Sequence, residues 1–497
     1  MNSQAAEYPG ADADVVWRSL VFPAGYQNPT PADRYNLVVI GAGPAGLITA
    51  IAAAGLGAKV ALIEKHHMGG DCLNVGCVPS KTLLAGATDG IGFERTMARM
   101  RAVRAAISQH DSVQRYRDAG VDVFLGAAKF LDASRVQVGA QTLTAKKFVI
   151  ATGARAFVPP VPGLAEHALS NESIFELRKQ PQRLAVLGGG PIGCELAQAF
   201  ARLGTEVHLI EMQSRVLPIE DEAASQAVQS ALLVDGVQLH LDTKVTAVEA
   251  AGVGKRLQYE PVDGGATASL DVDVVLAAVG RQRNVDGLGL EAAGVRFDRR
   301  SGIEVDSRLR TSMRHIFAAG DVCSRYQFTH MADAHARIVV RNALFMGRAR
   351  VDQLVVPWCT YTKPEVAHVG AVRRDLDAAS TPCKALRFDF ADLDRGKTDA
   401  VLDAQDVPAL DGYAELLVDP KSGQILGGTI VGKDAGEQLA PIALAMNQRI
   451  GLGSLGTLVL PYPTRSEYLR RLADAWNRTR LTPRAAGLLR WWLGRTR

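Results

Sequence analysis

The stretch LVVIGAGPAGLITAIAAAGLGAKVALIE, residues Leu37–Glu64, reads as a strand, a glycine-rich turn, a helix and a second strand that ends in an acid. A second stretch, LAVLGGGPIGCELAQAFARLGTEVHLIE at Leu184–Glu211, aligns with it without a gap. Each carries the G-x-G-x-x-G pattern of a turn that receives a pyrophosphate at a helix N-terminus. Because these features recur in the same order, the sequence predicts two Rossmann-like dinucleotide sites in an α/β fold.

The three glycines of each copy have separate physical roles. The first ends an apolar strand and lets the chain turn sharply. The second lacks a Cβ, so backbone can approach a pyrophosphate, and the third lets the helix pack closely on the sheet. The acid that closes the second strand can accept hydrogen bonds from ribose hydroxyls. These positions are Gly41, Gly43, Gly46 and Glu64 in the first copy, and Gly188, Gly190, Gly193 and Glu211 in the second.

A pair of closely spaced cysteines follows the first copy, in GGDCLNVGCVPSK at Gly69–Lys81. Cys72 and Cys77 can form a disulfide if a helical turn brings their Cα atoms within about 7 Å. Pro79 should end or bend that turn, while a helix N-terminus and Lys81 would favour a thiolate. The alternative is a pair of buried structural cysteines, but the flanking glycines and the position after the first acid favour a reactive pair.

Together these motifs resemble the FAD-dependent pyridine nucleotide-disulfide oxidoreductases, the family that includes dihydrolipoamide dehydrogenase, glutathione reductase and mercuric reductase. The resemblance extends from about Tyr35 to Asn477. It implies an α/β fold with two Rossmann-like domains, for FAD and NAD(P), and a C-terminal α+β dimerisation domain. The motifs that carry it are GGDCLNVGCVPSK, ATGAR at Ala151–Arg155, VGRQRN at Val279–Asn284 and HIFAAGDV at His315–Val322.

The resemblance also implies a role for each matched position. Cys77 would lie next to the flavin as its charge-transfer partner, and Cys72 would be the interchange thiol that meets the substrate. Lys81 would lie near the reactive flavin nitrogen and pair with Glu195, because an ammonium stabilises negative charge on the ring. The remaining matched FAD contacts are Thr152, Gly153, Gly320 and Asp321.

The order of the motifs suggests how the chain is organised. We expect Trp17 and Phe22 to anchor the N-terminal segment on the first domain, and residues 93–121 to form a long surface helix with a solvated charged face. The C-terminal part resembles the interface domain of the family, so the resemblance implies a homodimer whose active site spans two subunits. The expected divisions are an N-terminal extension (1–34), an FAD-binding domain (35–155 and 280–350), an NAD(P)-binding domain (156–279), a dimerisation domain (351–480) and a basic amphipathic tail (481–497).

Composition excludes several classes of protein. The 497 residues include 56 basic and 52 acidic side chains, so the net charge gives no reason to expect a nucleic-acid partner. Six cysteines are too few for a disulfide scaffold in a chain of this length and fit the reducing cytoplasm. No secretory signal or membrane-spanning run is visible. The histidines are weak candidate ligands, so we expect no resident metal.

The second acid also bears on the choice of nicotinamide cofactor. Glu211 can bond both ribose hydroxyls of NADH and would repel the 2′-phosphate of NADPH. Arg215 follows in the next loop and could in principle reach such a phosphate. The sequence therefore favours NADH over NADPH.

One motif near the C-terminus departs from the family, where disulfide reductases carry H-P-T-x-S-E. Here Tyr462 takes the histidine position in YPTRSE, which ends at Glu467. In the family the His and Glu of this motif form a proton-handling dyad, so the resemblance makes Tyr462 and Glu467 candidate catalytic residues. An imidazole titrates at about pH 6.5 and a phenol at about pH 10, so Tyr462 can donate a hydrogen bond or stabilise an anion but is a poor general base at neutral pH. Mercuric reductases also carry this tyrosine, but they end in a further cysteine pair, and this chain has no cysteine after Cys383. The alternative for Tyr462 is a subunit contact without a role in turnover.

Three functions stay open. The chain passes electrons from NAD(P)H through FAD to the Cys72–Cys77 disulfide and on to a small-molecule disulfide or related sulfur acceptor, or it reduces a soft, thiol-bound metal ion as mercuric reductases do. The third alternative is a non-catalytic FAD-binding redox sensor or membrane-associated component. The first two are favoured over the third because the set of Cys72, Cys77, Lys81 and Glu195 is intact.

The tail formed by residues 481–497 combines arginines with leucines and two tryptophans. We expect it to pack as an extra helix on the dimer. The alternative is that it lies on an anionic membrane surface, which would place the cytoplasmic enzyme peripherally on the inner membrane face.

Overall fold

The computed structural model describes residues 10–399 and 412–497. The chain divides into two compact units, Met1–Ser214 with Asp235–Gln353, and Arg215–Val234 with Leu354–Arg497. Helix α9 (Glu222–Val234) lies inside the segment expected to bind NAD(P), yet it groups with the second unit.

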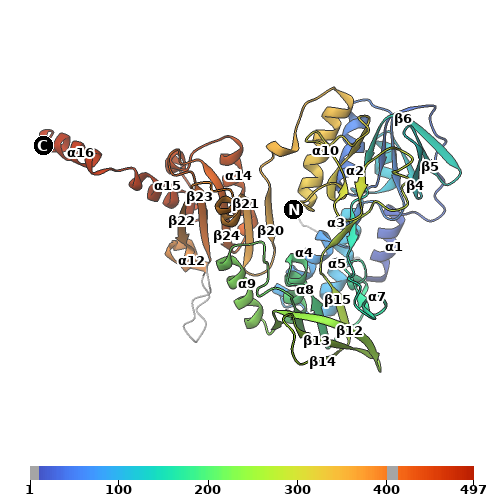
Figure 1. The fold of residues 1–497 in the computed structure, drawn as a ribbon, viewed down its shortest axis with the longest axis horizontal. Coiled ribbons are helices and arrows are strands. Elements are labelled where there is room, and N and C mark those ends of the chain that lie inside the picture. Colours follow the sequence, from blue (N-terminus) through green and yellow to red (C-terminus); the bar gives the residue numbers. More distant parts are fainter. Residues whose placement is uncertain (1–9, 400–411) are drawn as a thin grey trace, which may run out of the picture. The chain divides into compact units, whose positions relative to one another are not determined.

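The first glycine-rich stretch lies in a mixed sheet of the first unit (Figure 1), in which β3, β2, β1, β6 and β19 are parallel and β5 pairs antiparallel with β4 and β6. Its strand order is β3-β2-β1-β6-β5-β4, with β19 paired to β6. The first stretch supplies β1, β2 and the connecting helix α2 (Pro44–Gly55), against which α10 (Thr329–Leu344) packs. Near-continuous burial along β1 fits a parallel sheet that is covered on both faces. The strands are β1 (Tyr35–Ile40), β2 (Val60–Glu64), β3 (Val121–Leu125), β4 (Ala128–Asp132), β5 (Arg135–Val138), β6 (Gln141–Ile150) and β19 (Ile316–Ala318).

The second glycine-rich stretch builds a second sheet, which is parallel and has the order β11-β10-β9-β15-β8. Its helix α8 (Pro191–Arg202) begins, like α2, with a glycine N-cap followed by proline, which suits the first helical position. An antiparallel sheet, β12-β13-β14, accompanies it. The two predicted Rossmann-like units are therefore confirmed. The strands are β8 (Ala168–Leu169), β9 (Arg183–Leu187), β10 (Glu206–Ile210), β11 (Gln238–His240), β12 (Thr243–Ala251), β13 (Gly254–Pro261), β14 (Ala268–Val272) and β15 (Val274–Ala277).

The chain returns to the first sheet after the second one is complete. Strand β16 (Arg281–Arg283) pairs antiparallel with β7 (Ala154–Ala156), so the VGRQRN and ATGAR motifs lie side by side. Strand β19 then adds to β6 in parallel. The first sheet is thus assembled from two segments that are far apart in the sequence.

The second unit contains an antiparallel sheet of order β20-β21-β24-β23-β22. Helix α15 (Glu467–Thr479) buries Tyr468, Leu472 and Trp476 in the core on this sheet. This α+β arrangement agrees with the expected C-terminal domain. The strands are β20 (Pro357–Thr360), β21 (Glu365–Gly370), β22 (Lys384–Asp389), β23 (Tyr413–Val418) and β24 (Ile425–Gly432).

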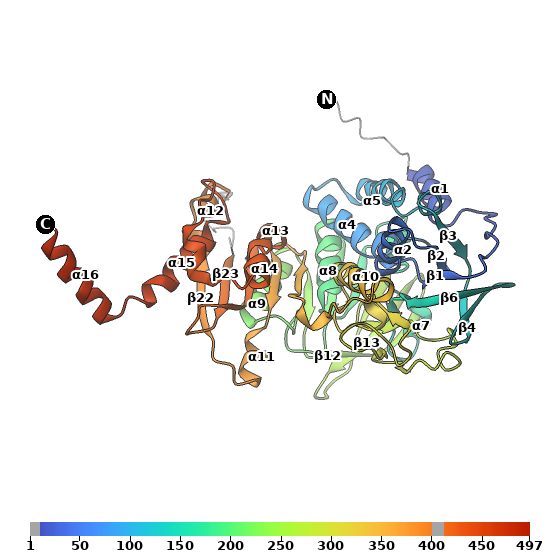
Figure 2. The ribbon, with the colours of Figure 1, turned by 90° about the horizontal axis from the view of Figure 1, so that it is seen from above.

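The prediction of one long surface helix over residues 93–121 is wrong in two respects. The segment forms α5 (Phe93–Ser108) and a separate short helix α6 (Val113–Asp118). Moreover, Arg101 and Arg104 of α5 are buried, because helix α1 (Gly10–Val21) packs beside α5 (Figure 2). Trp17 of α1 is buried as an anchor, whereas Phe22 is partly exposed.

Helix α16 (Pro483–Arg495) has no buried residue. Leucines and both tryptophans of the tail are exposed on it. Within the residues that the structure describes, no helix combines the length and the apolar character needed to cross a bilayer.

Candidate active site

The two glycine turns have matching backbone geometry. Gly41 and Gly188 have φ values of 102° and 107°, a region that favours glycine. A Cβ on Gly46 or Gly193 would lie 1.8 or 1.9 Å from the carbonyl oxygen of the first glycine of its own turn. Helix and strand can therefore approach this closely only with glycine at the third position. A Cβ on Gly190 would meet open space, as expected where a pyrophosphate approaches backbone.

The two acids that close the second strands are also held alike. Glu64 accepts hydrogen bonds from the backbone N–H groups of Ala42 (2.7 Å) and His66 (2.7 Å). Glu211 accepts from those of Gly189 (2.5 Å) and Gln213 (2.8 Å). Each carboxylate is thereby fixed beside its glycine turn. Burial raises the pKa of Glu64, so further donors such as ribose hydroxyls would stabilise its charged form.

The ATGAR and VGRQRN motifs meet around Asn284. Its side-chain amide donates to the carbonyl oxygen of Thr152 (2.9 Å), and its backbone N–H donates to that of Gly153 (3.0 Å). The Thr152 hydroxyl donates in turn to the carbonyl oxygen of Asn284 (2.8 Å). A Cβ on Gly153, whose φ is 67°, would meet open space. These hydrogen bonds hold the two segments together and leave the backbone of Gly153 accessible.

Asp321 is a buried carboxylate in the HIFAAGDV motif. Burial raises its pKa to about 6, although the Arg281 guanidinium, 3.6 Å away, lowers it. Arg281 also pairs with Asp71 in the cysteine segment. The neighbouring Gly320 N–H donates to Nδ1 of His335 (3.2 Å), and burial lowers the pKa of that histidine to about 4, so it is neutral at pH 7. A hydroxyl-rich ligand chain would supply Asp321 with the donors that a buried carboxylate needs.

The cysteine pair spans two short helical segments, α3 (Gly70–Asn74) and α4 (Cys77–Thr88). Both cysteines are free thiols, with Cys72 half-buried and Cys77 exposed, and their sulfurs are hydrogen-bonded to each other. Helix α4 begins at Cys77, so Pro79 falls in the first turn, where its missing N–H is not needed. The expectation that Pro79 would end or bend the turn was therefore wrong.

The two thiols differ in acidity. The hydrogen bond from Cys72 is the main factor that lowers the pKa of Cys77 to about 6, with further contributions from the Thr329 hydroxyl and the Lys81 ammonium. The same sharing of one proton raises the pKa of Cys72. Cys77 is thus the thiolate of the pair at neutral pH, and Cys72 keeps its proton.

An ion pair connects this site to the second glycine-rich stretch. Lys81 Nζ lies 2.7 Å from Oε2 of Glu195, which is buried on α8. Helices α4 and α8 pack on each other, so the pair is held between the two Rossmann-like sheets of the first unit. The predicted pairing of Lys81 with Glu195 is therefore present.

Tyr462 and Glu467 belong to the second unit. The Tyr462 side chain is 72% exposed and donates through its hydroxyl to Asp394 (2.6 Å). That bond raises the pKa of the phenol. Glu467 is buried and accepts from Arg471 (2.8 Å). Tyr462 is therefore held as a hydrogen-bonded neutral phenol.

Sequence reasoning missed three side chains of the site. Thr329 at the start of α10 lies with its Oγ1 3.4 Å from the sulfur of Cys77, although 252 positions separate them in the sequence. Arg281 and Asn284 lie in the VGRQRN motif, which marked the return of the chain but suggested no role for either. The motif was a usable signal for these two residues, whereas nothing near Thr329 pointed to the cysteines.

Comparison with known proteins gives a consistent picture. Residues 35–336 match the family described as pyridine nucleotide-disulphide oxidoreductase, and residues 356–473 match the dimerisation domain of that family. The chain is 33% identical to a mercuric reductase of Staphylococcus aureus, covering 88% of this chain and 82% of the relative. It is also 33% identical to a dihydrolipoyl dehydrogenase of Thermus scotoductus, covering 89% and 97%.

Solved structures agree with these relatives. The Cu(II) complex of the HOCl-induced flavoprotein disulfide reductase RclA from Escherichia coli superposes with a TM-score of 0.80 at 29% identity, covering 88% of this chain and 99% of the other. LpdA from Mycobacterium tuberculosis superposes with a TM-score of 0.79 at 27% identity, covering 89% and 99%.

Proposed function

Because the chain belongs to the pyridine nucleotide-disulphide oxidoreductases, which use FAD and NAD(P)H, we propose that Cys72 and Cys77 are its redox-active pair and that NADH is its electron donor. The acceptor is a small-molecule disulfide or a related sulfur compound. In one turnover, NADH and one proton are consumed, and one acceptor disulfide becomes two thiols. FAD, when bound, supplies a carrier that takes a hydride and passes two electrons on to sulfur.

The observation that carries this proposal is the unequal thiol pair. A thiolate is the reactive form of cysteine, and Cys77 has a pKa of about 6, so most of it is ionised at pH 7. Cys72 would exchange with the acceptor disulfide as the thiolate that forms when its proton passes to Cys77, with which it shares one proton. Structural cysteines have no need of such a difference in acidity.

The surrounding residues bind and orient the reactants. Lys81 places a positive charge near the cysteines, and Glu195 fixes the position of that ammonium. The two glycine turns receive the pyrophosphates, with Glu64 on the FAD ribose and Glu211 on the adenosine ribose of NADH, which carries the 2′-phosphate in NADPH. Asp321 accepts from the ribityl chain of FAD.

The loop after Glu211 supports NADH as the donor. The Arg215 guanidinium donates to the carbonyl oxygens of Pro218 (3.4 Å) and Glu220 (3.2 Å) of its own loop. Its hydrogen-bonding capacity is thus partly used within that loop. Glu211 keeps a carboxylate at the position where a 2′-phosphate would be repelled.

The test is a panel of electron acceptors with purified protein. NADH oxidation would be followed with lipoamide, glutathione disulfide, Hg(II) and Cu(II), in the wild type and in Cys72→Ser and Cys77→Ser. Cys383→Ser is a matched control, because Cys383 is a half-buried lone cysteine in the other unit. We expect a sulfur acceptor to be reduced by the wild type and the control only. Full activity in Cys77→Ser would refute the proposal.

A second candidate function is the reduction of a soft metal ion. It is favoured by Tyr462, which stands where disulfide reductases carry histidine and is held as a neutral phenol. Two adjacent soft sulfur ligands suit Hg(II) or copper, and mercuric reductases are among the relatives. This function is supported if the rate of NADH oxidation with Hg(II) or Cu(II) exceeds the rate with every sulfur acceptor.

The dimerisation-domain match supports a homodimer, and a dimer would bring Tyr462 and Glu467 of one subunit to the cysteines of the other. The exposed α16 either packs on this dimer or binds an anionic membrane surface. Deletion of residues 481–497 followed by co-sedimentation with anionic liposomes separates the two. Binding that is lost on deletion supports the membrane contact, and binding that is unchanged removes it.

A further inference from the structure

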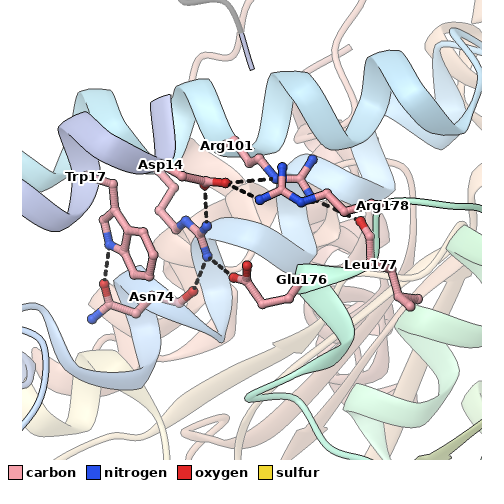
Figure 3. A network of polar contacts seen from close by, with 8 residues as sticks. Asp14, Trp17, Asn74, Arg101, Glu176, Leu177 and Arg178 are labelled. Carbon is pink, nitrogen blue, oxygen red and sulfur yellow. Dashed lines mark hydrogen bonds and ion pairs between the residues drawn. The ribbon is translucent and has the colours of Figure 1, made fainter. Parts of the chain in front are cut away.

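Helix α1 precedes the region that matches the family, which starts at residue 35. One face of α1 is buried, with Ala13, Asp14, Trp17 and Val21 at helical spacing, while Val15 is exposed. This face lies beside α5 and reaches the cysteine segment (Figure 3). The helix therefore adds side chains to the surroundings of the redox pair from outside the residues that match the family.

The contact with the cysteine segment is made through Asn74, which lies between Cys72 and Cys77. The Trp17 indole N–H donates to Oδ1 of Asn74 (2.7 Å). The Asn74 amide donates to the carbonyl oxygens of Met68 (3.0 Å) and Gly70 (2.8 Å). Asn74 therefore ties the turn to the backbone that precedes it, and Trp17 fixes the orientation of Asn74.

A buried arginine also holds this turn. Arg104 of α5 is fully buried and donates to the backbone carbonyl of Asn74 (3.2 Å). Its guanidinium lies 3.8 Å from the centre of the Trp17 ring and donates to Asp14 of α1 (2.9 Å). Trp17 and Asp14 thus position the arginine that positions the turn.

Asp14, Trp17, Asn74 and Arg104 form a polar cluster. Asp14 connects this cluster to the segment that leads into the second sheet. It accepts from Arg178, and Arg101 lies 3.5 Å away. Burial alone would raise the pKa of Asp14, but the hydrogen bonds from Arg178 and Arg104 outweigh it and keep the pKa below its ordinary value. The carboxylate is therefore charged at neutral pH and bound to guanidinium groups of two segments.

A further pair of contacts fixes the start of the cysteine segment. The backbone N–H of Met68 donates to the carbonyl oxygen of Val21 at the end of α1 (3.1 Å). The His67 ring stacks on Trp17 with 5.0 Å between ring centres. Helix α1 thus contacts the segment from His67 to Asn74 at both ends.

From these contacts we propose that α1 is a positioning element for the redox pair, and that Trp17, acting through Asn74, helps to set the equilibrium between the Cys72–Cys77 disulfide and its dithiol. A disulfide across four intervening residues closes readily only if the two sulfurs are held near each other, since ring closure costs conformational entropy. Loosening Asn74 would lower the effective concentration of one thiol at the other and favour the dithiol. The inference rests on the proposed function in that Cys72 and Cys77 must be the redox pair.

The test is Trp17→Phe, which keeps an aromatic ring over Arg104 but removes the indole donor. Val15→Ala is the matched control, because Val15 is an exposed residue of the same helix. Asp14→Asn tests the arginine side of the cluster with a side chain of the same shape, and it serves if Trp17→Phe does not fold. The holoenzyme would be equilibrated in dithiothreitol buffers of graded redox ratio, and the dithiol fraction measured by alkylation and mass spectrometry.

We expect the dithiol-to-disulfide ratio at a given buffer composition to rise up to about tenfold in Trp17→Phe, equivalent to about 30 mV for a two-electron couple. We expect a smaller rise in Asp14→Asn and none in Val15→Ala. A purely structural helix would lower the melting temperature and leave the ratio unchanged, and that result overturns the positioning role. If the wild type forms no Cys72–Cys77 disulfide in any buffer, the proposed function fails first, so the two failures are distinguishable.

Discussion

Replacing Thr329 with valine tests whether the acidity of Cys77 arises from the side chains around it. The Thr329 hydroxyl lies 3.4 Å from the Cys77 sulfur and can donate to the thiolate, and valine keeps its shape without a donor. Hydrogen bonds to charged groups contribute about 1.5–3 kcal/mol, which we reduce to about 1 kcal/mol for a long bond to an exposed sulfur. Because one pKa unit corresponds to about 1.4 kcal/mol, the pKa should rise by about 0.7.

The expected result follows from the starting pKa of about 6. At pH 6, the thiolate fraction of Cys77 should fall from about one half to about one sixth, a roughly threefold loss, whereas at pH 8.5 both proteins are nearly fully ionised. The assay is the rate of iodoacetamide alkylation at Cys77 in the reduced protein against pH, with the modified residue identified by mass spectrometry. Thr329→Ser keeps the hydroxyl and should titrate like the wild type. A valine variant with the wild-type titration curve would show that the hydroxyl does not stabilise the thiolate.

Three other predictions concern the cofactor, the acceptor and the fold. Glu211→Ala should raise the Kd for NADH more than that for NADPH in a binding titration, and an equal loss for both would contradict the assigned ribose contact. Tyr462→His should raise turnover with lipoamide near pH 7 by tenfold or more, because general acid–base catalysis typically contributes about 10²–10⁴-fold. If turnover is unchanged, the side chain at position 462 has no role in proton transfer. Gly423→Ala should destabilise the protein by about 1–3 kcal/mol in thermal unfolding. Gly423 has φ 73°, and an added Cβ would lie 2.8 Å from the Trp476 ring. A melting temperature like that of the wild type would contradict this reasoning.

The acidity of Cys77 also links stability to pH. Its pKa in the folded, reduced protein, about 6, is below the ordinary thiol value of 9.0. The unfolded chain therefore binds more protons between these values, so the reduced protein should become more stable as pH rises from 6 to 9. This gain is lost as pH falls through 6. Cys77→Ser should flatten that part of the profile in denaturant titrations.

The features predicted well from the sequence are those encoded by contiguous residues. The glycine turns and their acids, such as Gly41 with Glu64, depend on local backbone conformation, and the same pattern written twice predicted two sheets. The Lys81–Glu195 pair could be anticipated through the resemblance to a family. These features needed no knowledge of how distant segments meet.

The features that were missed depend on contacts between distant segments. An arginine-rich helix such as α5 looks like a solvated one, because nothing in its own sequence shows that Asp14, 90 positions away, neutralises Arg104. Thr329 is a common residue at a helix start, and its contact with Cys77 arises from the return of the chain after the inserted sheet. Pro79 was misread because its effect depends on where the helix begins.

The buried charge of Arg104 has a practical consequence for shortened proteins. A chain cut at residue 35, where the match to the family begins, would lose Asp14 and the Trp17 ring together. The buried Arg104 guanidinium, which pairs with two carboxylates in the full chain, would keep only the partly exposed Glu176. Removing one partner of a buried ion pair costs about 3–5 kcal/mol, a large part of the total stability of an ordinary domain. A protein shortened to the family boundaries for crystallisation or expression would therefore carry the buried Arg104 charge without its buried partner Asp14.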